Sequence, residues 1–227
     1  MGEIVEFPSN GHTGRGYLAR SVEGAGPGVV VIQEWWGLVP HIQDLCDRFA
    51  AEGFTALAPD LYRGKTTTEP DEAGKLMMSM NLEQAALHMG GAIDFLESSD
   101  AVRGEGVGVV GFCMGGGLAL MLAVQRPDDV KAVVPFYGLI PWEGAQPDWS
   151  RLAAPVQGHY AQQDGFFTPE LAAQLESELR QLGKTVEFHQ YDADHAFFND
   201  TRPEVHEPDD AARAWERTID FFRQHLG

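Results

Sequence analysis

The stretch "GVGVVGFCMGGG" at residues 106–117 decides the expected fold, because an apolar run leads into a cysteine between glycines. Residues 106–112 are apolar and rich in valine, which is typical of a strand buried on both faces. Residues 115–125, "GGGLALMLAVQ", predict a helix directly afterwards. Cys113 therefore stands between the end of a strand and the start of a helix. In an open parallel sheet, ligands bind beyond the carboxyl ends of the strands.

Segments typical of strands and helices alternate on both sides of this stretch. Repeated βα units imply an α/β protein with a mostly parallel central sheet and helices on both faces. Residues 4–7 and 17–21 flank the turn "NGHTG" and instead predict an antiparallel hairpin at one edge. Residues 62–80 predict a loop or short helix over the carboxyl edge. The other expected strands are 28–33, 54–59, 131–138, 154–161 and 185–193, and the expected helices are 41–53, 81–98, 168–183 and 209–226.

The composition limits the class of protein. The chain has 227 residues, 44% of them hydrophobic, which suits a single domain over residues 1–227 with a sizeable core. The formal net charge of −18 repels phosphate backbones and anionic lipid heads, so we expect no nucleic acid and no membrane as partners. No apolar run is long enough to cross a bilayer, and "MGEIVEFPSN" lacks a secretory-signal pattern. Two cysteines make no disulfide framework, and we expect a cytoplasmic protein.

Gly111, Cys113 and Gly115 form the nucleophile-elbow pattern, with sulfur in place of the usual hydroxyl oxygen. An elbow forces the nucleophile into a strained backbone conformation, and neighbouring side chains would collide with the adjoining strand and helix. The helix N-terminus favours a thiolate. The alternative is a glycine-rich structural turn with an inert thiol. Cys46, by contrast, falls mid-helix on an apolar face and is interpreted as packed core.

Two further residues occupy the places where this fold puts the partners of a nucleophile. The expected chain order is nucleophile, acid and histidine, each in a loop after a strand. Asp164 follows the strand 154–161 in "QQDGFFTP", and His195 follows the strand 185–193 in "ADHAFFND". His195 would take the thiol proton and return it to the leaving group, while Asp164 would fix the tautomer of the ring. Alone, Asp164 is also typical of a turn and His195 of a surface residue.

The loop "IQEWWGLVPH" at residues 32–41 leaves its strand at the same edge of the sheet. The backbone N–H groups of Trp35 and Met114 are expected to form the oxyanion hole. Glu34 is a carboxylate beside two tryptophans, and its alternative role is to cap a helix or to form a salt bridge. The histidines form no convincing metal set with Asp or Glu, so neither a metal nor a cofactor is expected.

Together, "QEWWGL", "LAPDLYRG", "GFCMGGG", the Asp164 loop and "DHAF" resemble the dienelactone hydrolase family over nearly the whole chain. The resemblance implies the α/β-hydrolase fold and a triad of Cys113, His195 and Asp164. It also implies an oxyanion hole from Trp35 and Met114. In this family the glutamate at the position of Glu34 contacts the thiol and takes part in generating the thiolate.

The residues that would select the substrate depart from the family pattern. Family members that cleave dienelactone hold its carboxylate with arginines, one of them four residues after the catalytic histidine, where this chain has Asn199. Arg63 and Arg202 are near in sequence and would substitute only if their loops are rearranged. A more apolar pocket is expected, although the methionines alone are also typical of helix packing. Its candidate residues are Trp36, Met77, Phe166 and Asn199, with Trp35, Met78 and Met80 beside them.

These observations favour a cysteine-dependent hydrolase of esters or lactones that forms an acyl-enzyme on Cys113. Two alternatives stay open. One is a general carboxylesterase or thioesterase with an apolar pocket, and the other is a non-catalytic protein of the same fold with Cys113 as a redox sensor. The expected partner is a small-molecule ester or lactone, and the expected assembly is a monomer or a small homo-oligomer.

Overall fold

The computed structural model describes residues 2–227, apart from the side chain of Glu143. Its internal contacts divide the chain into two compact units, one up to Val109 and one from Val110 to His225. The first unit contains strands β1 (Glu3–Ser9), β2 (His12–Ala19), β3 (Gly26–Ile32) and β4 (Thr55–Pro59), helices α1 (Pro40–Ala51), α2 (Pro70–Met78) and α3 (Leu82–Glu97), and the start of β5 (Val102–Phe112).

The second unit begins in the last residues of β5 and includes Cys113. It contains α4 (Met114–Gln125), β6 (Val130–Phe136), two short 3₁₀ turns (Glu143–Ala145 and Trp149–Arg151), β7 (Val156–Ala161), α5 (Pro169–Gln181), β8 (Val186–Tyr191) and α6 (Pro208–Leu226). The strands follow one another in the sheet in the order β1-β2-β4-β3-β5-β6-β7-β8. β2 pairs antiparallel with β1 and β4, whereas β3–β4, β6–β7 and β7–β8 are parallel. The expected α/β fold, with its antiparallel N-terminal hairpin, is confirmed.

The hairpin turn is tighter than expected from the sequence. Only Asn10 and Gly11 connect β1 to β2, and both have positive φ angles, 44° and 83°. Two successive positive φ angles match the twist of the flanking strands, and Asn-Gly is the pair that adopts them most easily. The remaining residues of "NGHTG" extend β2, so His12 and Arg15 lie on the strand and not in a loop.

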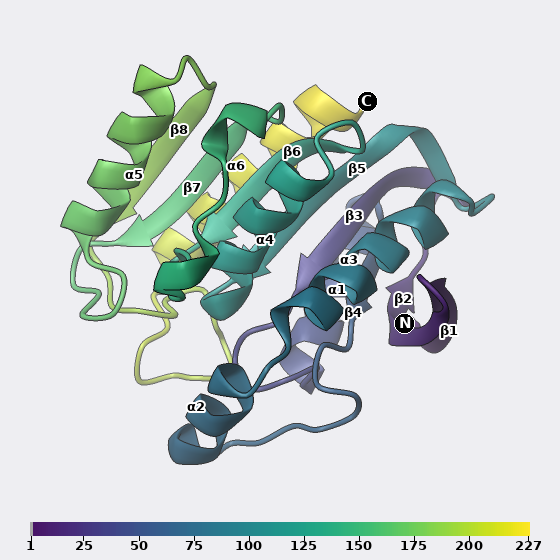
Figure 1. The fold of residues 1–227 in the computed structure, drawn as a ribbon, viewed down its shortest axis with the longest axis horizontal. Helices are drawn as coiled ribbons and strands as arrows, with labels where there is room; N and C mark the ends of the chain where they lie inside the picture. Colours follow the sequence, from purple (N-terminus) through teal and green to yellow (C-terminus); the bar gives the residue numbers. More distant parts are fainter. Residues whose placement is uncertain (1) are drawn as a thin grey trace. The chain divides into compact units, whose positions relative to one another are not determined.

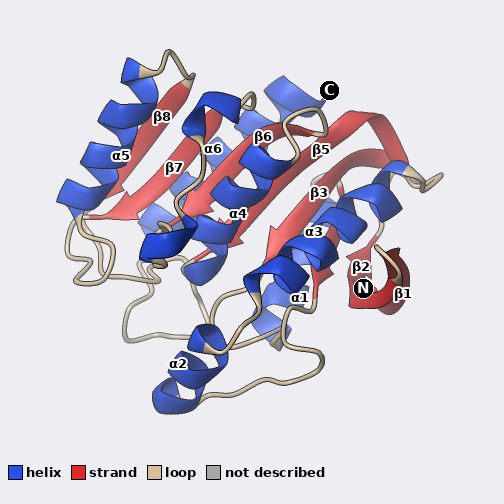
Figure 2. Cartoon of the chain, viewed as in Figure 1, coloured by secondary structure: helices blue, strands red, loops and turns tan. Residues whose placement is uncertain are grey.

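In the first unit, helices cover both faces of the strands. Figure 2 draws α3 in front of them and α1 behind. α1 buries Ile42, Leu45, Cys46 and Phe49 along one side, as the helical spacing of these residues predicts. α3 starts where the Asn81 side chain accepts a hydrogen bond from the Gln84 N–H at 3.0 Å. Residues 62–80 contain α2, whose residues are mostly half-buried or exposed.

In the second unit, α4 and α5 lie in front of the strands and α6 lies behind them (Figure 1). α4 is apolar around its whole circumference, and ten of its residues are buried. α5 instead buries only Ala172 and Leu179 and begins at Thr168, whose hydroxyl caps the Leu171 N–H. Within residues 2–227, no helix combines the length and the apolar character needed to cross a bilayer. The single domain expected for residues 1–227 stays a prediction.

Candidate active site

Cys113 sits at the junction of β5 and α4 in a backbone conformation that side chains rarely adopt. Its φ is 53° and its ψ is −120°. The strain is held by two backbone hydrogen bonds: the Cys113 N–H donates to the Phe136 carbonyl at 3.0 Å, and the Cys113 carbonyl accepts from the Gly116 N–H at 2.9 Å. Such strain costs about 1–3 kcal/mol and persists only where surrounding contacts enforce it. The thiol is half-buried and free of any disulfide.

Two glycines make room for this junction. A Cβ added to Gly111 would lie 1.9 Å from the Gly115 carbonyl oxygen, and one added to Gly138 would lie 2.0 Å from that of Cys113. Both distances are far inside van der Waals contact, so no side chain fits at either position. The sequence pattern predicts the need for Gly111. Gly138, after β6, becomes visible only once β6 lies beside the turn.

Asp164 and His195 come from the loops after β7 and β8, and the structure brings their side chains together. The His195 Nδ1 lies 2.7 Å from the Asp164 Oδ2. The other carboxylate oxygen, Oδ1, accepts the N–H groups of Phe166 and Phe167 at 2.7 and 3.0 Å. Asp164 therefore holds its own loop with one oxygen and orients the imidazole with the other. Its side chain is fully shielded from solvent, which strengthens each of these charge-assisted bonds.

The Cys113 side chain is the second group that acts on His195. Since the His195 Nδ1 faces Asp164, Nε2 is the nitrogen left for Cys113. Burial of the ring disfavours its charged form, but the hydrogen bonds and negative charges of Asp164 and Cys113 outweigh burial and raise the pKa of His195 to about 10. A ring with this pKa carries a positive charge at neutral pH.

Aromatic rings surround the His195 imidazole. Phe166, predicted to line the pocket, is 71% exposed, and its ring centroid lies 5.4 Å from that of His195. Phe167 and Tyr137 were not predicted from the sequence, and their ring centroids lie 6.1 and 5.1 Å from that of His195. Tyr137 is fully buried and has a positive φ of 34°. Its position directly after a strand's carboxyl end is the signal that could have found it.

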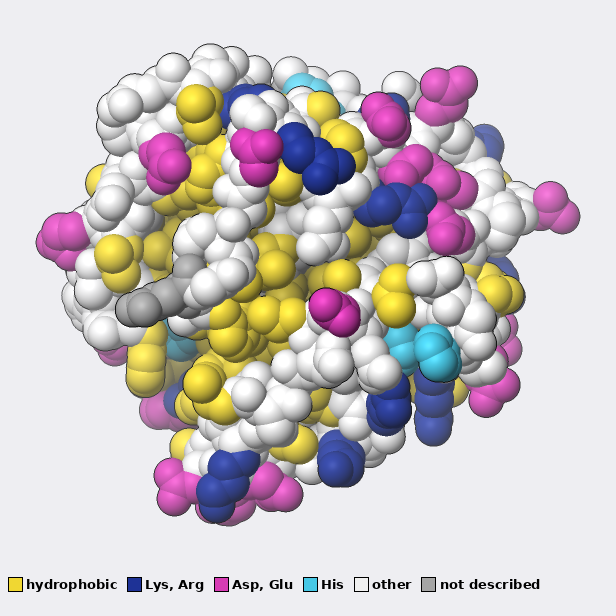
Figure 3. Space-filling model, in the orientation of Figure 1, with side chains coloured by type: hydrophobic (Ala, Val, Ile, Leu, Met, Phe, Trp, Pro, Cys, Tyr) yellow, Lys and Arg dark blue, Asp and Glu magenta, His cyan; other side chains and the backbone are white. Residues whose placement is uncertain are grey.

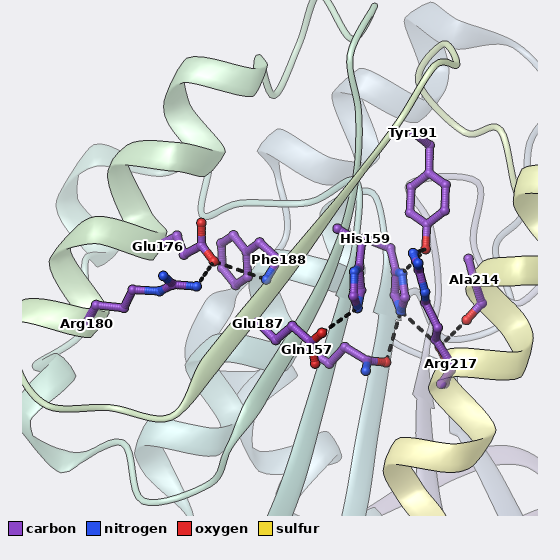
Figure 4. Close-up of polar contacts among 11 residues, drawn as sticks. Gln157, His159, Glu176, Arg180, Glu187, Phe188, Tyr191, Ala214 and Arg217 are labelled. Atoms are coloured by element: carbon purple, nitrogen blue, oxygen red, sulfur yellow. Dashed lines mark hydrogen bonds and ion pairs between the residues drawn. The ribbon is translucent and has the colours of Figure 1, made fainter.

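A second histidine, His159, lies in β7 within a buried polar network (Figure 4). Its Nδ1 is 2.8 Å from the Tyr191 hydroxyl, and its Nε2 is 3.2 Å from both Gln157 Oε1 and Thr218 Oγ1. The Thr218 hydroxyl donates to the Ala214 carbonyl at 2.8 Å, so its oxygen is free to accept the Nε2 proton. Burial, together with the charges of His189 and Arg217, lowers the pKa of His159 well below 6.5. This ring is therefore neutral.

The predicted residues of the first unit lie in two places. Glu34, Trp35 and Trp36 follow β3, and the two tryptophan rings meet edge to face with centroids 5.0 Å apart. Glu34 is 1% exposed, and both tryptophans are half-buried. The Trp36 carbonyl accepts the Thr67 N–H at 3.1 Å, which ties this loop to the segment before α2. Met77 is half-buried on α2.

The other residues considered for substrate recognition have local structural partners. Asn199 is buried, and its Oδ1 accepts hydrogen bonds from the N–H and the hydroxyl of Thr201 at 3.1 and 2.6 Å. Arg202 pairs with Glu204 at 2.8 Å. Arg63 donates to the Gln84 side chain. In the described part of the chain, no group of three His, Cys, Asp or Glu side chains could hold a metal ion.

Comparisons with known proteins identify the family of this chain. The sequence model of the Dienelactone hydrolase family matches residues 15–226. "Protein usf" of Aquifex pyrophilus is 39% identical, and "Putative carboxymethylenebutenolidase" of Aquifex aeolicus is 35% identical, each over 100% of both chains. A crystal structure titled "Putative Dienelactone Hydrolase" from Klebsiella pneumoniae superposes with a TM-score of 0.89 at 28% identity, covering 99% of each chain. The chain therefore belongs to the dienelactone hydrolase family, within the α/β-hydrolases that act on carboxylic ester and lactone bonds.

Proposed function

We propose that this protein hydrolyses small esters or lactones through an acyl-enzyme on Cys113. The observation that carries the proposal lies in the second unit: the Asp164 Oδ2 is 2.7 Å from the His195 Nδ1, and Cys113 acts with Asp164 to raise the pKa of the same ring. The raised pKa of His195 supports a ring that carries the thiol proton at neutral pH.

In the acylation step, the Cys113 thiolate attacks the carbonyl carbon of the ester, and the carbonyl electron pair moves onto oxygen. When the tetrahedral intermediate collapses, the bond between carbon and the alkoxy oxygen breaks. The His195 imidazolium gives its proton to that oxygen, which leaves as an alcohol. For a lactone the alcohol stays attached to the acyl group. Asp164 stabilises the imidazolium and keeps its Nε2 turned toward sulfur.

In the deacylation step, neutral His195 accepts a proton from water while the water oxygen attacks the thioester carbonyl. Collapse of the second intermediate breaks the carbon–sulfur bond, releases the carboxylic acid and restores the thiolate and imidazolium. The backbone N–H groups of Trp35 and Met114 are proposed to stabilise the oxyanion of both intermediates. Glu34 is proposed to assist thiolate formation when substrate enters. Replacing Glu34 by Gln should then lower the acylation rate while leaving deacylation unchanged.

The proposed substrates carry little negative charge next to the scissile bond. Arg202 is paired with Glu204, and the position that holds an arginine in dienelactone-cleaving members is the buried Asn199. The exposed Phe166 ring beside His195 supports an apolar acyl or alcohol group. We propose that Trp36 and Met77 also contact the substrate. Hydrolysis of p-nitrophenyl esters should therefore exceed hydrolysis of dienelactone under matched conditions.

The test compares wild type with Cys113→Ala on p-nitrophenyl acetate and on dienelactone. The variant should lose nearly all turnover, and mass spectrometry of quenched wild type should find an acyl group on Cys113. Equal rates for the two proteins on every ester would refute the enzyme assignment. A stable sulfenic acid at Cys113 without any esterase activity would identify a redox sensor instead.

Cys46 provides an internal control for the reactivity of Cys113. Cys46 is completely buried, and burial raises the pKa of its thiol above that of an ordinary cysteine. Iodoacetamide at neutral pH should alkylate Cys113 quickly and leave Cys46 unmodified in the folded protein. Faster labelling of Cys46 would contradict the proposed thiolate. Location in the cytoplasm and assembly as a monomer or small homo-oligomer stay predictions, which cell fractionation and light scattering would check.

A further inference from the structure

The first unit contains a pocket lined mainly by basic side chains. The cavity measures about 340 Å³, and its lining residues are His12, Thr13, Arg15, Asp60, Arg63 and His88. They come from β2, from the loop after β4 and from α3. A concave, basic surface is unusual on a chain with a net charge of −18, because acidic residues outnumber basic ones by 34 to 16. On the face drawn in Figure 3, histidine and Lys or Arg side chains also gather at the lower right.

No acidic side chain of the described residues forms an ion pair with Arg15. Its guanidinium has no hydrogen-bond or ion-pair partner among the described residues, although its carbonyl accepts the Asp60 N–H at 2.7 Å. Glu6 lies opposite Arg15 in the β1–β2 ladder but forms no ion pair with it in the described structure. A guanidinium left without a partner at a concave site is a ready donor for an anion with several oxygens.

Asp60 is the one acidic residue among those that line the pocket, and its carboxylate accepts hydrogen bonds from its own loop. The Asp60 carboxylate accepts the Tyr62 N–H at 3.1 Å and the Gly64 N–H at 2.5 Å. Between these two amides, Arg63 adopts a positive φ of 54°, a conformation that costs a non-glycine residue about 1–2 kcal/mol. Asp60 therefore holds the loop that carries Arg63. Both carboxylate oxygens of Asp60 already accept backbone N–H groups.

The basic groups are close enough to influence one another. Burial lowers the pKa of His88, and the charges of Arg63 and His12 lower it further, against the hydrogen bond and charge of Asp60. A bound anion would offset this mutual repulsion. Arg63 and His88 also line an adjoining cavity of about 210 Å³, whose apolar walls include Leu61, Leu76 and Met80. A ligand with an anionic head and a short apolar body would fill both cavities.

We infer that this double pocket binds a phosphate-type dianion, with the phosphate on Arg15, Arg63 and the two histidines and an apolar organic group against Leu76 and Met80. A phosphate group carries three or four oxygens on one phosphorus. These oxygens can accept hydrogen bonds at the same time from side chains on β2, on the loop after β4 and on α3. A single carboxylate would reach fewer of them. The site is distinct in composition from the cysteine triad, since it shares none of its residues.

Calorimetric titration with inorganic phosphate and with phenyl phosphate tests the inference on the intact chain. Wild type should bind both saturably, and phenyl phosphate should bind several-fold more tightly. Arg15→Gln should weaken both ligands by roughly tenfold, the loss expected for one charge-assisted contact. Leu76→Ala should weaken phenyl phosphate alone. In nuclear magnetic resonance spectra, both ligands should shift the ring signals of His12 and His88.

Arg180→Gln is the matched control. Arg180 lines a cavity of about 410 Å³ on α5, but Glu176 neutralises it at 2.6 Å, so its replacement should leave phosphate binding unchanged. Absence of saturable binding by wild type would overturn the inference. So would equal affinities of wild type and Arg15→Gln, or equal effects of Arg15→Gln and Arg180→Gln. Equal affinities for phosphate and phenyl phosphate, unchanged by Leu76→Ala, would overturn the assignment of the organic group.

Discussion

His195 and His159 lie in the same unit, on the loop after β8 and on β7, and the rings of both form hydrogen bonds with side chains. Their pKa values nevertheless move in opposite directions, up to about 10 for His195 and well below 6.5 for His159. Burial lowers both. The neighbouring groups decide the outcome, because Asp164 and Cys113 supply negative charge, whereas the hydrogen-bond partners of His159 are neutral and the charges of His189 and Arg217 lower its pKa further.

The neutral ring of His159 has a structural role in the second unit. His159 bridges β7, β8 and α6 through Gln157, Tyr191 and Thr218 (Figure 4). Its carbonyl also accepts the N–H of Tyr137 at 2.7 Å, next to the Phe136 carbonyl that binds the Cys113 N–H. The loops after β7 and β8 carry Asp164 and His195. The neutral His159 therefore stabilises β7 and β8, the two strands whose following loops carry Asp164 and His195.

The largest expected effect is the loss of turnover in His195→Gln. Without the proton carrier, the rate of p-nitrophenyl acetate hydrolysis should fall by roughly 10⁴-fold or more. His159→Gln, measured alongside, should retain activity within about tenfold, because the hydrogen bonds of that ring go to Tyr191, Gln157 and Thr218 and not to Cys113. If both variants fold and lose a comparable fraction of the hydrolysis rate, the different roles assigned to His195 and His159 are wrong.

Asp164→Asn should produce the next largest effect, a fall in kcat of roughly 10³-fold, because the neutral amide no longer stabilises the imidazolium. The substitution should also lower the pKa of His195, since its hydrogen bond with the Asp164 carboxylate would be replaced by a neutral one. The pH profile of Cys113 alkylation reports this change. A profile identical to that of wild type would contradict the role assigned to Asp164.

The raised pKa of His195 predicts a loss of stability at alkaline pH. Its contribution should be fully present below the unfolded value of 6.5 and should disappear as the pH rises through about 10. The expected loss is roughly 2–4 kcal/mol, measured as the difference in unfolding free energy between wild type and His195→Gln in urea. A difference that stays constant across this range would show that the two negative partners do not stabilise the charged ring.

His159 predicts a smaller effect on the acidic side. The pKa of His159 is lowered in the folded state, so below pH 6.5 the unfolded chain binds a proton at this residue and the folded chain does not. Folding is therefore less favourable as the pH falls. Wild type should lose about 1 kcal/mol over the first pH unit below that value, and His159→Gln should lack this component. His12→Gln, which changes an exposed histidine on β2, serves as the control. The same slope in all three proteins would contradict the buried, neutral state of His159.

Much of the candidate site is visible in the sequence because its residues carry local signals. Cys113 stands between Gly111 and Gly115, and Asp164 and His195 follow strands in the order expected for the fold. Other residues carry no such signal. Tyr137 resembles any aromatic residue at a strand end, and no pattern in the sequence predicts that the Asn199 Oδ1 accepts hydrogen bonds from Thr201.

The sequence by itself determined the alternation of strands and helices, the elbow and the chain order of Cys113, Asp164 and His195, because these depend on neighbours along the chain. Only the tertiary structure decided which histidine is charged and which is neutral, since that depends on the groups that strands from distant segments bring against each ring. It also decided that His12, Arg15, Arg63 and His88 line one pocket, although they are up to 76 residues apart in sequence. A pKa and a pocket are properties of three-dimensional proximity, to which separation along the chain is a poor guide.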